Sequence, residues 1–130
     1  MENREATVSR NTKETQIQLK FAVDGSGVSD ICTGIDFFDH MLDGFARHGL
    51  FDLFVRTTGD LKVDSHNTIA DTGIVLGNAI REAVGDKKGI DRYGSCILPM
   101  AENLVPCAED MSGSTSLYFA GEFTVDRMGE

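Results

Sequence analysis

The sequence predicts an α+β protein, in which a four-stranded mixed or antiparallel sheet carries two helices on one face and further strands follow toward the C-terminus. Three observations predict this class. Residues 13–23 alternate polar and apolar side chains with the period of a strand. Two later segments repeat apolar residues with helical spacing. Short runs rich in β-branched and aromatic residues, separated by turn residues, indicate the remaining strands.

The composition is that of a globular protein. Among 130 residues, 41% are hydrophobic and 25% are charged, and no apolar run approaches the ~20 residues of a membrane span. The net charge of -9 opposes binding to phosphate backbones. The polar N-terminus has no apolar stretch typical of a secretory signal. We therefore expect a cytoplasmic protein with neither a membrane nor a nucleic-acid partner. Cys32, Cys96 and Cys107 form no C-x-x-C pair and are expected to be reduced and buried.

The first predicted strand lies between Lys13 and Val23. Its odd-numbered residues from Thr15 to Phe21 would face the core, while charged and amide side chains alternate with them. The "DGSG" stretch at residues 24–27 has the composition of a turn. "VSDICT" is then expected to return as the second arm of a hairpin.

The first predicted helix is "GIDFFDHMLDGFARHG", in which Phe38, Met41, Leu42 and Phe45 recur with helical spacing. Asp36 is placed to cap its start and Gly49 to cap its end. Next, "LFDLFVRTTGD" has the β-branched and aromatic character of a strand.

A second helix is predicted from near Ser65 to a C-cap at Gly85. Three stretches after it are predicted to be strands: "YGSCILPM", "NLVPCAEDM" and "SLYFAGEFTV". The residues expected to form the apolar stripe of the second helix are Ile69, Gly73, Leu76, Ile80 and Ala83, widened by Ala79 and Val84.

The three histidines are the first candidates for chemistry. His40 lies on the polar side of the first helix, where a histidine is more often solvated than a ligand. His48, beside Gly49, suits the negative end of the helix dipole. His66 opens the second helix near Asp71, and an imidazole and a carboxylate one turn apart can share Mn²⁺ or Zn²⁺. An ordinary helix start capped by Asp64 or Ser65 explains the same residues.

Two further groups of residues could act on a substrate. Glu14 and Glu102 could form a pair of carboxylates, although the sequence does not define their separation. Arg92 with Lys87 and Lys88 could hold a phosphate, because guanidinium and ammonium groups bind this anion. A solvated basic turn is an equal alternative.

The residues "TGIDFFDHMLDGFARHGLFDLFV", "VDSHNTIADTGIVLGNAIREAVGDKKGIDRYGS" and "LPMAENL" resemble the imidazoleglycerol-phosphate dehydratases of histidine biosynthesis. The resemblance runs from about Arg10 to Gly129. It implies a manganese-dependent hydro-lyase of amino-acid biosynthesis, which dehydrates imidazole glycerol phosphate to imidazole acetol phosphate. The resemblance also implies that each chain folds into two similar half-domains and that the chains assemble into a homo-oligomer. Residues 1–130 would therefore form one truncated dehydratase-like domain, with a first half-domain at about 1–92 and the start of a second at 93–130.

The resemblance also implies roles for individual residues. Glu14 matches the acid/base glutamate, and His40 and His66 match metal ligands for Mn²⁺. Arg92, with Lys88 and His48, would bind the phosphate substrate.

Four positions depart from the family pattern. Asn67 replaces the second histidine of "HHTxED" and Ala70 replaces its glutamate, while Ala101 and Ser114 replace an aspartate and a phosphate-binding arginine. An amide binds manganese weakly and a methyl group does not bind it. The chain alone is thus expected to be weakly active or inactive. The alternative is a non-catalytic structural or regulatory relative, or a half-domain that self-assembles.

Overall fold

The computed structural model describes residues 3–122. They divide into two compact units, one that extends to Asp86 and one that begins at Lys87. No helix within this described part is long and apolar enough to cross a membrane.

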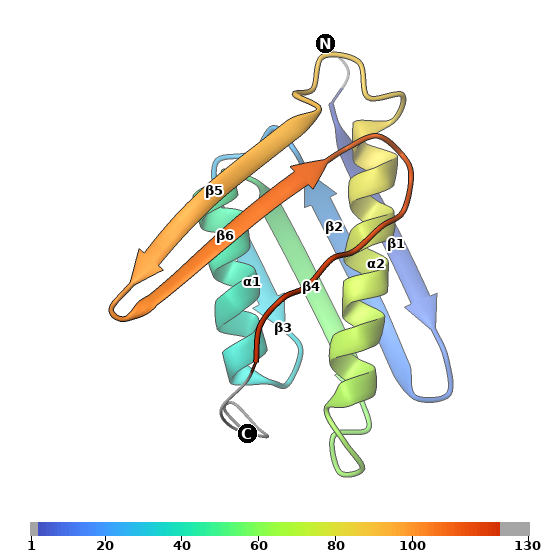
Figure 1. Ribbon diagram of the computed structural model, residues 1–130. Coiled ribbons are helices and arrows are strands. Elements are labelled where there is room, and N and C mark those ends of the chain that lie inside the picture. Colours follow the sequence, from blue (N-terminus) through green and yellow to red (C-terminus); the bar gives the residue numbers. More distant parts are fainter. Residues whose placement is uncertain (1–2, 123–130) are drawn as a thin grey trace. The chain divides into compact units, whose positions relative to one another are not determined.

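The first unit is a four-stranded sheet with two helices on one face, as Figure 1 shows. The strands lie in the order β1-β2-β4-β3, with antiparallel pairing except between β3 and β4, which are parallel. The sheet is therefore mixed, and the predicted α+β class is confirmed. Its elements are β1 (Glu5–Asn11), β2 (Thr15–Ala22), β3 (Ser29–Cys32), α1 (Asp36–Gly49), β4 (Asp52–Gly59) and α2 (His66–Val84).

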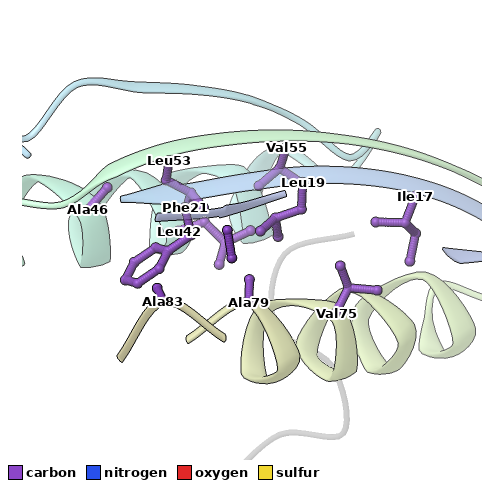
Figure 2. Packing of buried hydrophobic residues seen from close by; sticks show 11 residues of the cluster. Ile17, Leu19, Phe21, Leu42, Ala46, Leu53, Val55, Val75, Ala79 and Ala83 are labelled. Atoms are coloured by element: carbon purple, nitrogen blue, oxygen red, sulfur yellow. The ribbon is translucent and has the colours of Figure 1, made fainter. Parts of the chain in front are cut away.

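The predicted alternation in β2 is confirmed, and its inward side chains form the centre of the core. Leu19 and Phe21 are fully buried between the sheet and the helices (Figure 2). The Phe21 ring also packs against those of Phe45 and Phe51. The other buried apolar residues of this core are Ala6, Ile17, Leu42, Ala46, Leu53, Val55, Val75, Ala79 and Ala83.

The predicted hairpin after β2 is wrong. β3 does not return beside β2 but pairs in parallel with β4, with Ile31 opposite Val55. The reason lies in Asp52, whose carboxylate accepts hydrogen bonds from the backbone N–H groups of Ser26 and Val28 at 3.0 and 3.1 Å. These bonds lower the pKa of Asp52 and hold the loop against the start of β4. The hairpin forms instead between β2 and β1, an edge strand that the sequence pattern did not predict.

The buried face of α2 also differs from the predicted stripe. Ala79 and Ala83 are buried as predicted. However, Ile69 is 40% exposed and Gly73 is exposed, whereas Thr68, Thr72 and Val75, which were not predicted, are fully buried. The Thr72 hydroxyl lies 3.0 Å from that of Thr57 on β4 and donates to the Thr68 carbonyl at 2.7 Å. Small and hydroxyl-bearing residues let the helix approach the sheet closely, and a search for apolar residues alone overlooks them.

Both predicted caps of α1 are wrong, although the helix itself is confirmed. The N-cap residue is Ile35, and no side chain caps this end. At the other end Leu50, not Gly49, adopts the left-handed conformation, with φ of 57°. A Cβ on Gly49 would lie 2.3 Å from the Phe51 ring, so glycine is required there for packing.

We expect Leu50→Gly to stabilise the protein by about 0.5–1 kcal/mol, because glycine adopts a positive φ without steric cost. Leu50 is 61% exposed, so little packing is lost. Urea unfolding followed by circular dichroism measures the change. Leu50→Ala is the control, since it removes the same side chain but keeps Cβ. Equal stability of the two variants would contradict the prediction.

The second unit contains the hairpin of β5 (Tyr93–Met100) and β6 (Asn103–Asp110), and both of these predicted strands are confirmed. The third, at residues 116–125, is not: the part up to Glu122 forms no strand, and the rest lies outside the described residues. The prediction of buried cysteines is wrong, because all three are exposed and free. Cys32 lies on an edge strand, and the other two lie on a hairpin without a buried residue.

Candidate functional site

Both helices start at the same end of the four-stranded sheet, where β3 and β4 have their carboxyl ends. We call this end of the sheet the common edge. Because β3 and β4 are parallel and each leads into a helix, α1 and α2 begin at the same edge (Figure 1). The β1–β2 turn lies at this edge too, since Thr15 at the start of β2 pairs with Gly59 at the end of β4. Carboxyl ends of parallel strands commonly carry ligand sites in α/β sheets, and this mixed sheet offers the same geometry.

The loops that precede the two helices touch each other. A Cβ on Gly34, before α1, would lie 2.8 Å from Cδ1 of Leu61, before α2. Gly34 also has a φ of 86°. Glycine at this position therefore allows both a left-handed turn and a close approach of the two loops.

A hydrogen-bonded chain joins α2 to the β1–β2 turn. The buried Thr15 hydroxyl donates to the Asp71 carboxylate on α2 at 2.7 Å, and an Arg10 guanidinium nitrogen lies 4.0 Å from the other carboxylate oxygen. Thr12 Oγ1 lies 3.3 Å from Thr15 Oγ1 and accepts the backbone N–H of Glu14 at 3.2 Å. The turn that carries Glu14 is thus attached to α2 at Asp71, within the first two turns of the helix.

A second close contact lies one turn earlier on the same helix. A Cβ on Gly59 would fall 2.1 Å from the Thr68 hydroxyl oxygen. This oxygen is buried and has no hydrogen-bond partner among the described residues. Gly59 therefore lets the first turn of α2 lie directly against the end of β4.

The structure places three of the predicted site residues at this common edge. Glu14 is exposed in the β1–β2 turn, His66 is the exposed first residue of α2, and His40 is exposed in the second turn of α1. The other three are His48, Lys88 and Arg92. His48 is near the opposite end of α1, and Lys88 and Arg92 belong to the second unit.

The residues at the edge do not form a metal centre by themselves. Across residues 3–122, no three His, Cys, Asp or Glu side chains gather closely enough to hold an ion. Asp71 faces Thr15, and Asn67 and Ala70 are exposed beside His66. This donor set does not fit a two-metal manganese site, because an amide and a methyl group stand where the resemblance implies ligands.

The start of α2 is held in part as the sequence suggested. The Asp64 carboxylate accepts the His66 backbone N–H at 3.3 Å, whereas Ser65 makes no capping bond with its side chain. On α1, Asp39 accepts hydrogen bonds from the backbone N–H and the hydroxyl of Thr33. The carboxylate next to His40 is therefore already engaged in the loop before α1.

Arg92 forms a two-point ion pair within the second unit. Its Nε and a terminal nitrogen donate to the two carboxylate oxygens of Asp110 at 2.7 and 3.1 Å, and its guanidinium lies 5.0 Å from the centre of the Tyr93 ring. The hydrogen bonds from Arg92 lower the pKa of Asp110. An anion bound by Arg92 must compete with this carboxylate or use the remaining N–H groups.

Thr15 and Asp71 are the site residues that the sequence analysis did not connect. The sequence places Thr15 only on the core face of its strand. The other buried side chains on this face are Ile17, Leu19 and Phe21, which are apolar. A hydroxyl among them indicates a hydrogen-bond partner elsewhere in the fold, because buried hydroxyls are usually paired.

Comparison with a solved structure identifies the type of domain. The sheet, its two helices and the site at the helix starts define an α+β domain of the dehydratase type: the crystal structure of imidazoleglycerol-phosphate dehydratase from Staphylococcus aureus subsp. aureus N315 matches 96% of this chain, with a TM-score of 0.84 and 31% identity. A model of the family described as imidazoleglycerol-phosphate dehydratase matches residues 33–130. The chain belongs to this family, as the resemblance in its sequence had indicated.

Curated relatives agree with this assignment. The chain is 54% identical over 127 residues to the imidazoleglycerol-phosphate dehydratase of Lachnoclostridium phytofermentans, and the match covers 98% of the chain and 65% of the relative. It is 52% identical over 136 residues to that of Geobacter sulfurreducens, of which it covers 70%. The chain thus spans about two thirds of the length of the relatives it matches.

Proposed function

We propose that this chain acts in histidine biosynthesis and takes part in the dehydration of imidazole glycerol phosphate to imidazole acetol phosphate. Family membership supports the reaction. The observation that carries the proposal to this chain is that Glu14, His40 and His66 all lie at the same end of the sheet, where both helices begin. Removal of water from this substrate requires a base for a carbon-bound proton and cations for the phosphate.

Glu14 is the proposed acid/base residue. Its backbone is held by the hydroxyl of Thr12, and through Thr15 the turn is joined to Asp71. The side chain itself is exposed, so a substrate can reach it. An anchored backbone with an accessible carboxylate is suited to the transfer of a proton at a defined position.

The phosphate is assigned to cationic residues. Arg92 presents a planar guanidinium, and Lys88 is an exposed ammonium group four residues earlier. His48 is exposed near the opposite end of α1 from Glu14, His40 and His66, so it would bind the phosphate only at the site of another copy of the chain. The proposal predicts that these groups contribute to substrate affinity more than to the proton transfer.

Manganese belongs to the proposal only as a weakly bound ion. His40 and His66 are the imidazoles at the common edge, and Asn67 and Ala70 offer no strong donor beside them. Manganese chemistry would supply Lewis-acid stabilisation of the substrate when the ion is bound. No step is assigned to it, because the residues present do not fit the two-metal centre.

The proposal also includes assembly into a homo-oligomer and a location in the cytoplasm. Apolar side chains are exposed on the helices at Phe37, Met41 and Ile74 and on the β5–β6 hairpin at Ile97 and Leu104. Exposed apolar surface of this kind favours burial in an assembly, so we propose a homo-oligomer. Free cysteines agree with a reducing compartment.

A second candidate function is a non-catalytic structural or regulatory subunit. The exposed Asn67 and Ala70 at the start of α2 favour it, because the surrounding fold is intact while two donors are absent. Its assembly would follow the same exposed apolar surfaces. The two functions differ in turnover and in metal binding.

Turnover of imidazole glycerol phosphate by the purified protein, with and without added Mn²⁺, tests the proposal. We expect slow dehydration that Glu14→Gln reduces by about 100-fold or more, as for the loss of a general base. Glu82→Gln, an exposed position on α2, is the matched control and should retain the activity. Absence of turnover together with absence of Mn²⁺ binding by calorimetry would favour the non-catalytic subunit. Turnover unaffected by Glu14→Gln would remove Glu14 from the acid/base role.

A further inference from the structure

Two of the three cysteines lie directly opposite each other in the β5–β6 hairpin. In the antiparallel register of this hairpin, Cys96 is the partner of Cys107. Figure 1 shows the two strands side by side along their length. Both thiols are exposed and free, and neither belongs to the site at the helix starts. Cys32, the remaining cysteine, lies on β3 and has Arg56 as its strand partner.

Direct partners in an antiparallel pair have side chains on the same face. Their Cα atoms are separated by about 4.5 or 5.5 Å, depending on the hydrogen-bonding pattern of the pair. A disulfide requires a Cα separation of about 4.4–6.8 Å. Both values fall within this range, so the two sulfurs can be joined without a change of register.

We propose that Cys96 and Cys107 form a dithiol modification site, which reaction with a low-molecular-weight disulfide such as oxidised glutathione converts into an intramolecular disulfide. The site is specific because the pairing of the strands, and not chance collision, brings the two thiols together. Exposure of both side chains makes them accessible to a small disulfide.

The reaction proceeds by two exchanges. One cysteine thiolate attacks a sulfur of oxidised glutathione, which forms a mixed disulfide and releases one glutathione thiolate. The second cysteine, as a thiolate, then attacks the sulfur of the first cysteine, and its attack breaks the mixed disulfide and releases the second glutathione. The protein dithiol loses two hydrogens and is oxidised, while one oxidised glutathione is reduced to two thiols.

The disulfide would stabilise the β5–β6 hairpin, which buries none of its own side chains. An isolated two-stranded hairpin is marginally stable, and every residue of β6 is exposed. Its turn contains Ala101 in a left-handed conformation, with φ of 51°. A cross-link between the middle of β5 and the middle of β6 would hold the register on both sides of this turn. Reduction by a thiol would reverse it.

Mass spectrometry of the intact protein after treatment with oxidised glutathione tests the proposal. Cys32→Ser, which removes the third exposed thiol, is expected to lose two hydrogens, and non-reducing digestion of this variant and of the wild-type protein should yield linked peptides containing Cys96 and Cys107. In Cys96→Ser, the second exchange is impossible. Cys107 should then retain a glutathione adduct, and Cys107→Ser should behave likewise at Cys96.

A change of register provides the matched control. Cys107→Ser combined with Ala108→Cys moves the thiol to the neighbouring position, opposite Ser95 and on the other face of the hairpin. This variant should accumulate adducts without the intramolecular bond. Stable glutathione adducts on both cysteines of the wild-type protein, linkage between chains in dilute protein, or equal bond formation in the shifted variant would each overturn the proposal.

Discussion

Asn67→His combined with Ala70→Glu is expected to raise the affinity for Mn²⁺ by about 100-fold. Residues that only hydrogen-bond to metal ligands typically change metal affinity by about 10–100-fold, and two added ligands should have an effect at least as large. His66, Asn67 and Ala70 are all exposed on the first turns of α2. Positions 67 and 70 are three residues apart, and side chains at this spacing lie on the same side of a helix. Isothermal titration calorimetry with MnCl₂ measures the affinity directly.

The same pair of side chains placed farther along the helix provides the control. Asn78→His with Arg81→Glu repeats the spacing at exposed positions of α2, but without a neighbouring imidazole such as His66. Its affinity should remain close to that of the wild-type protein. A gain of equal size in both variants would show that the start of α2 has no special role. No gain in the first variant would show that the helix does not present its donors together.

Asp71→Ala is expected to lower the free energy of unfolding by about 1–3 kcal/mol, because the buried Thr15 hydroxyl loses its carboxylate acceptor and keeps only its contact with Thr12. The Asp71 carboxylate accepts the hydrogen bond of the fully buried Thr15 hydroxyl at 2.7 Å. Arg10 lies 4.0 Å away and would also lose its nearest charge partner on α2. Urea unfolding at neutral pH measures the change.

Three further variants separate this hydrogen bond from the general effect of a substitution in α2. Asp71→Asn keeps an acceptor oxygen and should cost less than Asp71→Ala. Glu82→Ala is an exposed change on the same helix and should remain within about 0.5 kcal/mol of the wild-type protein. Thr15→Val combined with Asp71→Ala should cost less than the sum of the single changes. Additive costs would show that the two side chains do not interact.

Elements with a strong local pattern could be predicted. The alternation that ends at Phe21 identified the central strand, because one face of β2 is buried and the other is exposed. The helical spacing of Phe38, Leu42 and Phe45 located α1, and the short β-branched runs located β4, β5 and β6. The candidate residues Glu14, His40 and His66 were likewise found from the sequence, and their roles await the experiments above.

Pairing and contact could not be predicted in the same way. The sequence does not show that Asp52 holds the loop before β3, and this contact sends β3 to the far side of β4 instead of back to β2. Thr72 faces the sheet because its hydroxyl partner Thr57 lies there, and Thr68 faces it because Gly59 leaves room beside it. Both conditions exist only in the folded chain.

The sequence by itself determined the fold class, the central strand and both helices, since each depends on residue type and local spacing. Tertiary structure alone decided that Thr15 meets Asp71 and that Cys96 faces Cys107. These contacts join residues that are 56 and 11 positions apart. The register of the strands and the packing of α2 place them, and neither property is encoded within a short segment of the chain.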